Sequence, residues 1–142
     1  MFKWSKDLGE ACFKFEQAAK VFKEIGEDKQ AVDAYLNFAR CSEESKEYSG
    51  AADGYAEAAR LLPGKQWKTS LQYLKQAEIY YKMSGFEDRG FTLMKKFAAD
   101  LCDTDDKESI EAGLSTYKEL YPLLFEDENM TMNFDMLEMY IK

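Results

Sequence analysis

Apolar residues recur every three or four positions along most of the chain, which is the spacing of one face of an α-helix. Gly26 follows the first stripe, and glycine readily takes the left-handed conformation that ends a helix. The pattern predicts helices at about 7–25, 28–44, 49–62, 66–83 and 87–101. The first two stripes comprise Leu8, Ala11, Cys12, Phe15, Ala18, Ala19 and Phe22, and then Ala31, Ala34, Tyr35, Phe38 and Cys41.

Turn-forming residues separate these helices. Residues 45–49 form one turn, Pro63-Gly64 stops the third helix, and Ser84-Gly85 stops the fourth. The acidic residues 103–106 predict a turn that caps a sixth helix, because carboxylates complement the dipole at a helix N-terminus. Pro122 ends or kinks that helix, and a short seventh helix is predicted at about 128–141. No alternating pattern typical of strands occurs.

An aromatic residue followed four positions later by alanine repeats along the chain. Each such pair lies on one helix face, where alanine lets a neighbouring helix approach and the ring fills the space beside it. The repeat predicts antiparallel hairpins of about 40 residues, stacked as an all-α solenoid of about seven helices in one domain, 1–142. The pairs are Phe15/Ala19, Tyr35/Ala39, Tyr55/Ala59 and Tyr73/Ala77, at steps of 20, 20 and 18.

Composition and charge narrow the classes of partner. The 142 residues are 46% hydrophobic, enough for a core, and carry a formal net charge of −8. Residues 1–70 hold 11 basic and 12 acidic groups, whereas residues 71–142 hold 8 and 15, so the acidity lies in the second half. Such a surface repels nucleic acids and anionic lipids. We therefore expect a protein partner and no insertion into a membrane.

Candidate chemistry is sparse. The chain has no histidine and no glycine-rich phosphate loop, so we expect no enzyme activity, no catalytic residue, no cofactor and no metal. A small enzyme that uses paired carboxylates is the weakest alternative. The residues from Asp103 lack the central glycine of a calcium loop and carry Leu114 at its twelfth position, which favours a helix cap. Three cysteines without C-x-x-C spacing indicate free thiols: Cys12, Cys41 and Cys102.

The first ten residues lack the apolar core of a signal peptide, and no apolar run is long enough to span a bilayer. We therefore expect a cytoplasmic location, with the nucleus as an alternative. The C-terminal segment holds four of the seven methionines and predicts either a last core helix or an adaptable docking surface. Candidate partner-binding residues are Asp105, Asp106, Glu108, Glu126, Asp127, Glu128, Met132, Met136, Met139 and Tyr140.

Two family resemblances follow from these motifs. The segment FEQAAKVFKEIGEDKQAVDAYLNFA, 15–39, resembles the early repeats of the soluble N-ethylmaleimide-sensitive-factor attachment proteins (SNAPs), gamma-type members especially. That resemblance implies a tetratricopeptide-like solenoid that adapts a SNARE bundle to its disassembly ATPase, NSF. It also implies basic residues on the concave face and a C-terminal leucine, whereas this chain has an acidic second half and ends Tyr-Ile-Lys.

The second resemblance is to the 40-kDa huntingtin-associated protein, a relative of the same fold. It is carried by ARC at 39–41, EAARL at 57–61 and YPLLFEDEN at 121–129. It implies a non-enzymatic partner held by the HEAT-repeat solenoid of huntingtin and connected with early endosomes. We take this partner as the first hypothesis, in which carboxylates from Asp100 to Glu138 meet basic patches, and the SNARE machinery as the alternative.

The alanine positions give a direct test of the repeat. Replacing Ala19 or Ala59 by leucine should lower the free energy of unfolding by about 1–3 kcal/mol, because the larger side chain overpacks a close helix contact. Thermal unfolding of the two variants measures the effect. Unchanged midpoints for both would show that alanine does not line the helix contacts.

Overall fold

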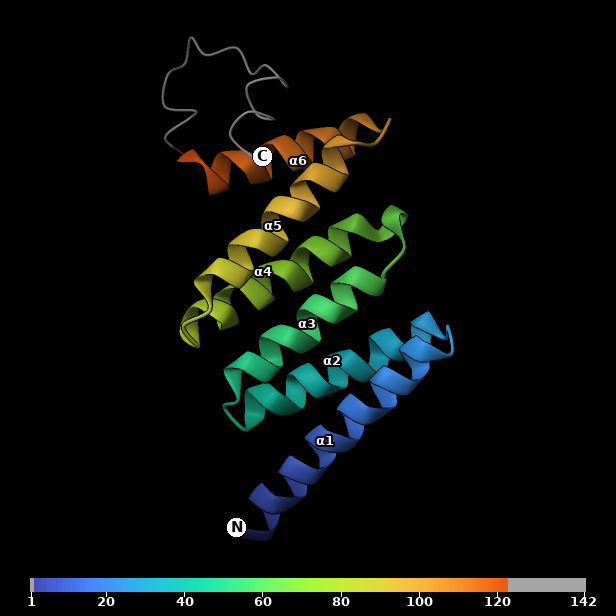
Figure 1. Ribbon diagram of the computed structural model, residues 1–142, viewed down its shortest axis with the longest axis vertical. Coiled ribbons are helices and arrows are strands. Elements are labelled where there is room, and N and C mark those ends of the chain that lie inside the picture. The colour runs from blue at the N-terminus through green and yellow to red at the C-terminus, as the bar shows by residue number, and fades with distance from the viewer. Residues whose placement is uncertain (1, 123–142) are drawn as a thin grey trace. The chain divides into compact units, whose positions relative to one another are not determined.

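Six α-helices follow one another along residues 2–122, the part of the chain that the structure, a computed structural model, describes (Figure 1). No strand occurs in this part, and no helix in it is long and apolar enough to cross a membrane. The predicted seventh helix, 128–141, lies outside the described residues. The helices are α1 (Phe2–Glu24), α2 (Asp28–Glu44), α3 (Tyr48–Leu61), α4 (Trp67–Met83), α5 (Glu87–Cys102) and α6 (Lys107–Leu120), with a 3₁₀ turn at Gly64–Gln66.

The helix ends follow from local turn chemistry. Gly26 and Gly85 have φ of 80° and 84°, as predicted for residues that end helices. The next residue in each case donates its backbone N–H to a carbonyl five residues back, at 2.9 Å for Glu27 and 2.7 Å for Phe86. Lys46 makes the same turn with φ of 63°, although lysine rarely takes this conformation. The first helix starts five residues earlier than predicted, because no helix-breaking residue precedes the stripe.

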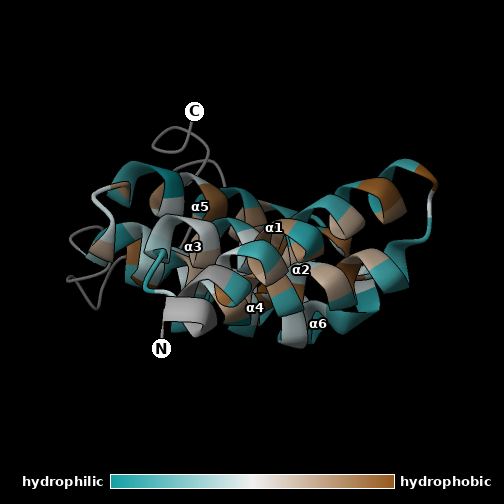
Figure 2. Cartoon of the chain, turned by 90° about the horizontal axis from the view of Figure 1, so that it is seen from below, coloured by the Kyte–Doolittle hydropathy of each residue, from teal (hydrophilic) through white to brown (hydrophobic). Residues whose placement is uncertain are grey.

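The chain forms two compact units, Met1–Gly90 and Phe91–Lys142. In the first unit α1 packs on α2, α2 on α3 and α3 on α4, and successive helices run in alternate directions (Figure 1). Helix α2 is therefore covered on two sides, and Val32, Leu36 and Ala39 are buried in addition to the predicted stripe. Figure 2 shows hydrophilic and apolar residues on the same helices, as expected for amphipathic elements.

The predicted alanine seam is confirmed. Ala19, Ala39 and Ala77 are fully buried, and Ala59 is 5% exposed. The burial of the four aromatic partners is less uniform, since Tyr35 is buried and the other three are half-buried. At Gly54 the backbones of α2 and α3 come so close that an added Cβ would lie 2.9 Å from the Cβ of Ala39 and from the carbonyl oxygen of Tyr35. Small residues thus set the spacing of these helices.

The second unit is described between Phe91 and residue 122. The C-terminal part of α5 packs on α6 through Ala98 and Tyr117, and Phe91 meets Tyr121 edge to face at 5.4 Å between ring centroids. The acidic turn caps α6 as predicted. The Asp106 side chain accepts the backbone N–H of Ser109 at 3.1 Å.

Two glycines allow a matched test of the α2–α3 contact. Gly54→Ala should destabilise the protein by about 1–3 kcal/mol, because the new methyl group clashes with backbone and Cβ atoms of α2. Gly9→Ala is the control, because no atom lies within 4 Å of the added Cβ, and it should stabilise by about 0.5–1 kcal/mol through helix propensity. Urea unfolding gives both values. Equal effects of the same sign would contradict the close contact.

Candidate functional site

A groove of about 580 Å³ runs over α2 between α1 and α3 in the first unit. Tyr35 and Phe38 of α2 and Ala56 of α3 form its buried apolar floor. Its charged rim and side walls, which we call the groove rim, comprise Glu16, Lys20, Lys23 and Glu24 of α1 and Asp53, Glu57 and Arg60 of α3, with Tyr81 of α4 at one side. We call this site the α1–α3 groove.

Helical periodicity places the rim residues. Positions 16, 20 and 23 on α1 and positions 53, 57 and 60 on α3 each follow one helix face. Each of these stripes lies beside the apolar stripe that packs the helix against α2. The two polar stripes consequently face each other across Tyr35 and Phe38.

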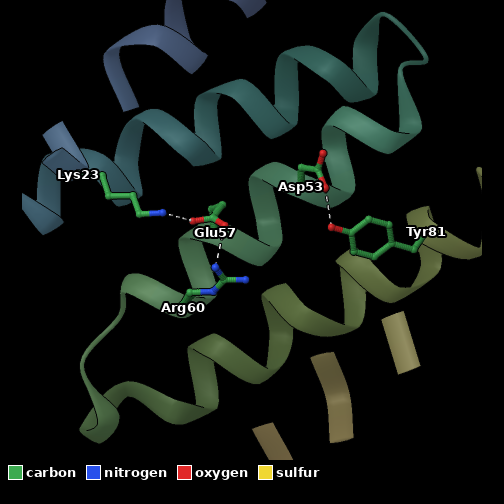
Figure 3. Close-up of polar contacts among 5 residues, drawn as sticks. All are labelled: Lys23, Asp53, Glu57, Arg60 and Tyr81. Atoms are coloured by element: carbon green, nitrogen blue, oxygen red, sulfur yellow. Dashed lines mark hydrogen bonds and ion pairs between the residues drawn. The ribbon is translucent and has the colours of Figure 1, made fainter. Parts of the chain in front are cut away.

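Glu57 is the centre of the rim's ion pairs. Its Oε2 atom accepts a hydrogen bond from Lys23 Nζ at 3.0 Å, and its Oε1 atom lies 3.1 Å from Arg60 Nη1 (Figure 3). The Lys23 pair joins α1 to α3 across α2. The side chain of Lys23 is 43% exposed, that of Glu57 is 23% exposed and that of Arg60 is 59% exposed. Pairs this accessible to water contribute about 0–1 kcal/mol each, so they orient side chains more than they stabilise the fold.

A phenol and a carboxylate meet at the other end of the groove. The hydroxyl of Tyr81, a buried residue of α4, donates to Asp53 Oδ1 at 2.6 Å (Figure 3). Burial and then this hydrogen bond raise the pKa of Tyr81 above the usual range of tyrosine. Burial also raises the pKa of Tyr35, and the charge of Glu57 adds to that shift. Both phenols are therefore neutral at physiological pH.

Other tyrosines gather on a different side of α3. Tyr55 lies two positions from both Asp53 and Glu57 and so points roughly away from the groove. Its hydroxyl donates to Glu43 of α2, and burial followed by this bond raises its pKa. We call the four half-buried rings on this side the tyrosine stack. Its neighbouring centroids lie 5.7 Å (Tyr48–Tyr80), 6.2 Å (Tyr55–Tyr80) and 6.0 Å (Tyr55–Tyr73) apart.

A second hollow of about 600 Å³ shares Phe38 with the α1–α3 groove and continues it along α2. Small residues line much of it, including Gly9, Cys12 and Gly50. Cys41 is buried behind, where burial and then the contact with Cys12 raise the pKa of its thiol to about 12. Burial also raises the pKa of the Cys102 thiol. These two thiols are protonated at neutral pH, as expected for structural rather than reactive cysteines.

The structure places three of the predicted partner-binding residues. Asp105 and Asp106 are exposed in the turn before α6, and Glu108 is exposed in the first turn of that helix. Asp106 also accepts the Ser109 hydroxyl at 2.7 Å. The others lie outside the described residues: Glu126, Asp127, Glu128, Met132, Met136, Met139 and Tyr140. The partner-binding role of all ten remains a prediction. The groove rim was not predicted from the sequence, although charged residues at helical spacing beside each apolar stripe mark it.

Alkaline titration tests the bond between Tyr81 and Asp53. Unfolded phenols ionise near pH 10, whereas folded Tyr81 keeps its proton to higher pH. The native state then binds more protons than the unfolded state, so stability should fall as pH rises above about 10. Tyr81→Phe should cost about 1 kcal/mol at neutral pH and make this fall shallower. Thermal midpoints between pH 8 and 11 measure both effects, and parallel curves for the two proteins would contradict the shift.

Comparison with known proteins identifies the family. The family described as "Soluble NSF attachment protein, SNAP" matches residues 2–139. Searches of curated proteins and of solved structures gave no match. The match supports the SNAP resemblance, while none of the comparisons supports the huntingtin-associated one. With a family match that spans nearly its whole length and stacked helical hairpins in its first unit, the chain belongs to the SNAP family.

Proposed function

We propose that the protein is a non-enzymatic adaptor that holds a helical protein partner in the α1–α3 groove. The observation that carries this proposal is the SNAP family match together with a groove flanked by two charged helices. The family description names attachment to NSF, and the SNAP resemblance implies a SNARE bundle, so these two are the proposed partners. The huntingtin-type partner is not carried further, because no comparison supports it.

The dimensions of the groove suit a helix. The two hollows share Phe38 and together follow α2 from Tyr35 to Ser45. Ten residues of helix span about 15 Å, which corresponds to almost three turns of a partner helix lying alongside. The apolar floor offers contact area, and the charged rim offers orientation. This combination is typical of a docking surface with an apolar centre and a polar edge.

The cations of the groove rim also favour a partner that carries carboxylates at the contact. Lys20, Lys23 and Arg60 are the cations of the groove rim, and they come from both of its sides. Charges at such a rim steer association and fix register more than they add affinity. The acidic residues Asp105 and Glu108, outside the groove, are proposed as a second contact for a basic surface of the machinery.

Charge reversal in the groove tests the function. Lys20→Glu and Arg60→Glu should each weaken binding to a purified SNARE four-helix bundle by about tenfold or more, because they remove a cation and add repulsion. Stimulation of SNARE disassembly by NSF should fall in parallel. Lys75→Glu is the control, with the same charge change at an exposed position of α4 that does not line the groove.

Binding measured by isothermal titration and disassembly measured by loss of the bundle give independent readings. The proposal fails if the wild-type chain binds no SNARE bundle. It also fails if the Lys75 variant loses as much binding as the groove variants, since the site would then lie elsewhere.

A further inference from the structure

Glu57 holds an unusual place among the charges of the α1–α3 groove. Each of its two carboxylate oxygens meets a different cation, at 3.0 Å from Lys23 Nζ and 3.1 Å from Arg60 Nη1 (Figure 3). A carboxylate of a partner would bind the same two groups, Lys23 and Arg60, because they are cations on the groove rim. The chain's own side chain already satisfies them.

Three of the remaining rim charges, Glu16, Lys20 and Asp53, also have partners within the chain. Lys20 lies 3.7 Å from Glu16, and Asp53 accepts the Tyr81 hydroxyl. The groove rim carries three cations and four carboxylates, so it is not a basic surface in spite of its lysines and arginine. Recognition of an acidic partner therefore requires that an internal carboxylate give way.

We propose that Glu57 occupies the position that a partner carboxylate takes in the complex, and that binding exchanges one carboxylate for the other on Lys23 and Arg60. This inference rests on the proposed function in that it takes the groove as the docking site. The partner that fits is an acidic helix, and Glu57 is the residue that sets this specificity. Partners with too few carboxylates to replace it, or with cations in their place, are excluded.

The exposure of the three side chains makes the exchange feasible. Glu57 is 23% exposed, and Lys23 and Arg60 are 43% and 59% exposed, so each group remains in contact with water when its pair opens. Tyr35, beneath them, is buried and held by the packing of α2, so the floor of the groove does not depend on the pairs. A partner carboxylate would replace one charge-assisted bond by another of the same kind.

Glu57→Gln tests the exchange, because it keeps the shape of the side chain and removes its charge. The probes are a soluble helical peptide built from glutamate and alanine and its counterpart built from lysine and alanine. The variant should bind the acidic peptide at least about threefold more tightly than the wild-type chain, with a steeper loss of affinity in salt, and should bind the basic peptide less well.

Glu24→Gln is the matched control, since Glu24 also lines the groove and the change in net charge is identical. It should alter both affinities by less than half as much as Glu57→Gln. Equal effects of the two variants would show that only the overall charge of the groove matters and would overturn the proposal. A gain of Glu57→Gln for the basic peptide would overturn it as well.

A measurement on the wild-type chain covers the case in which the variant folds poorly. The carbon NMR resonance of the Glu57 carboxyl group should shift when the acidic peptide saturates the groove, and the Glu24 resonance should shift less. An unmoved Glu57 resonance would reject the exchange. If a SNARE bundle binds no form of the chain while these peptide effects occur, the proposed partner is wrong and the exchange stands. If the bundle binds and the peptide effects are missing, the exchange is wrong and the proposed partner stands.

Discussion

The close approach of α1, α2 and α3 through small side chains is the constraint on which the rest of the first unit depends. Ala19, Ala39 and Gly54 leave no room for a larger group at these contacts. Because α2 has small side chains on its contact face, side chains of α1 and α3 can meet across it. The pair between Lys23 and Glu57 depends on that spacing, since a wider separation of α1 and α3 would put the two charged groups out of reach of each other. Packing of the smallest residues thus determines the chemistry of the groove.

The two sides of α3 use polar groups in different ways. On the side away from the groove, the Tyr55 phenol binds Glu43 within the tyrosine stack, where aromatic contact and burial fix both partners. On the groove side, Glu57 and its cations remain in contact with water. Bonds of the first kind are costly to break, and bonds of the second kind are cheap. The fold can therefore remain rigid while the charges of the groove rearrange.

The sequence was sufficient for the helices and for the residues that line their contacts. Helix ends at Gly26 and Pro63 are local events, and the aromatic-alanine repeat records which face of each helix is covered. It was not sufficient for the groove rim. The pairing of charges between α1 and α3 depends on the rotation and offset of these two helices, which α2 separates in the sequence. The turn at Lys46 was predicted, but its positive φ was not, since glycine usually marks that conformation.

The groove also departs from what the SNAP resemblance implies, and the departure has a physical consequence. A uniformly basic concave face would attract any acidic protein over a distance of about 8 Å, the screening length at physiological salt. In this groove Glu16 and Glu57 pair with the cations, and the rim holds four carboxylates against three cations, so its net charge is not positive. Attraction at a distance is then weak, and selection occurs at contact, where a partner must place its carboxylates in register with Lys23 and Arg60. Such a site recognises the spacing of charges on a helix rather than the total charge of the protein that carries it.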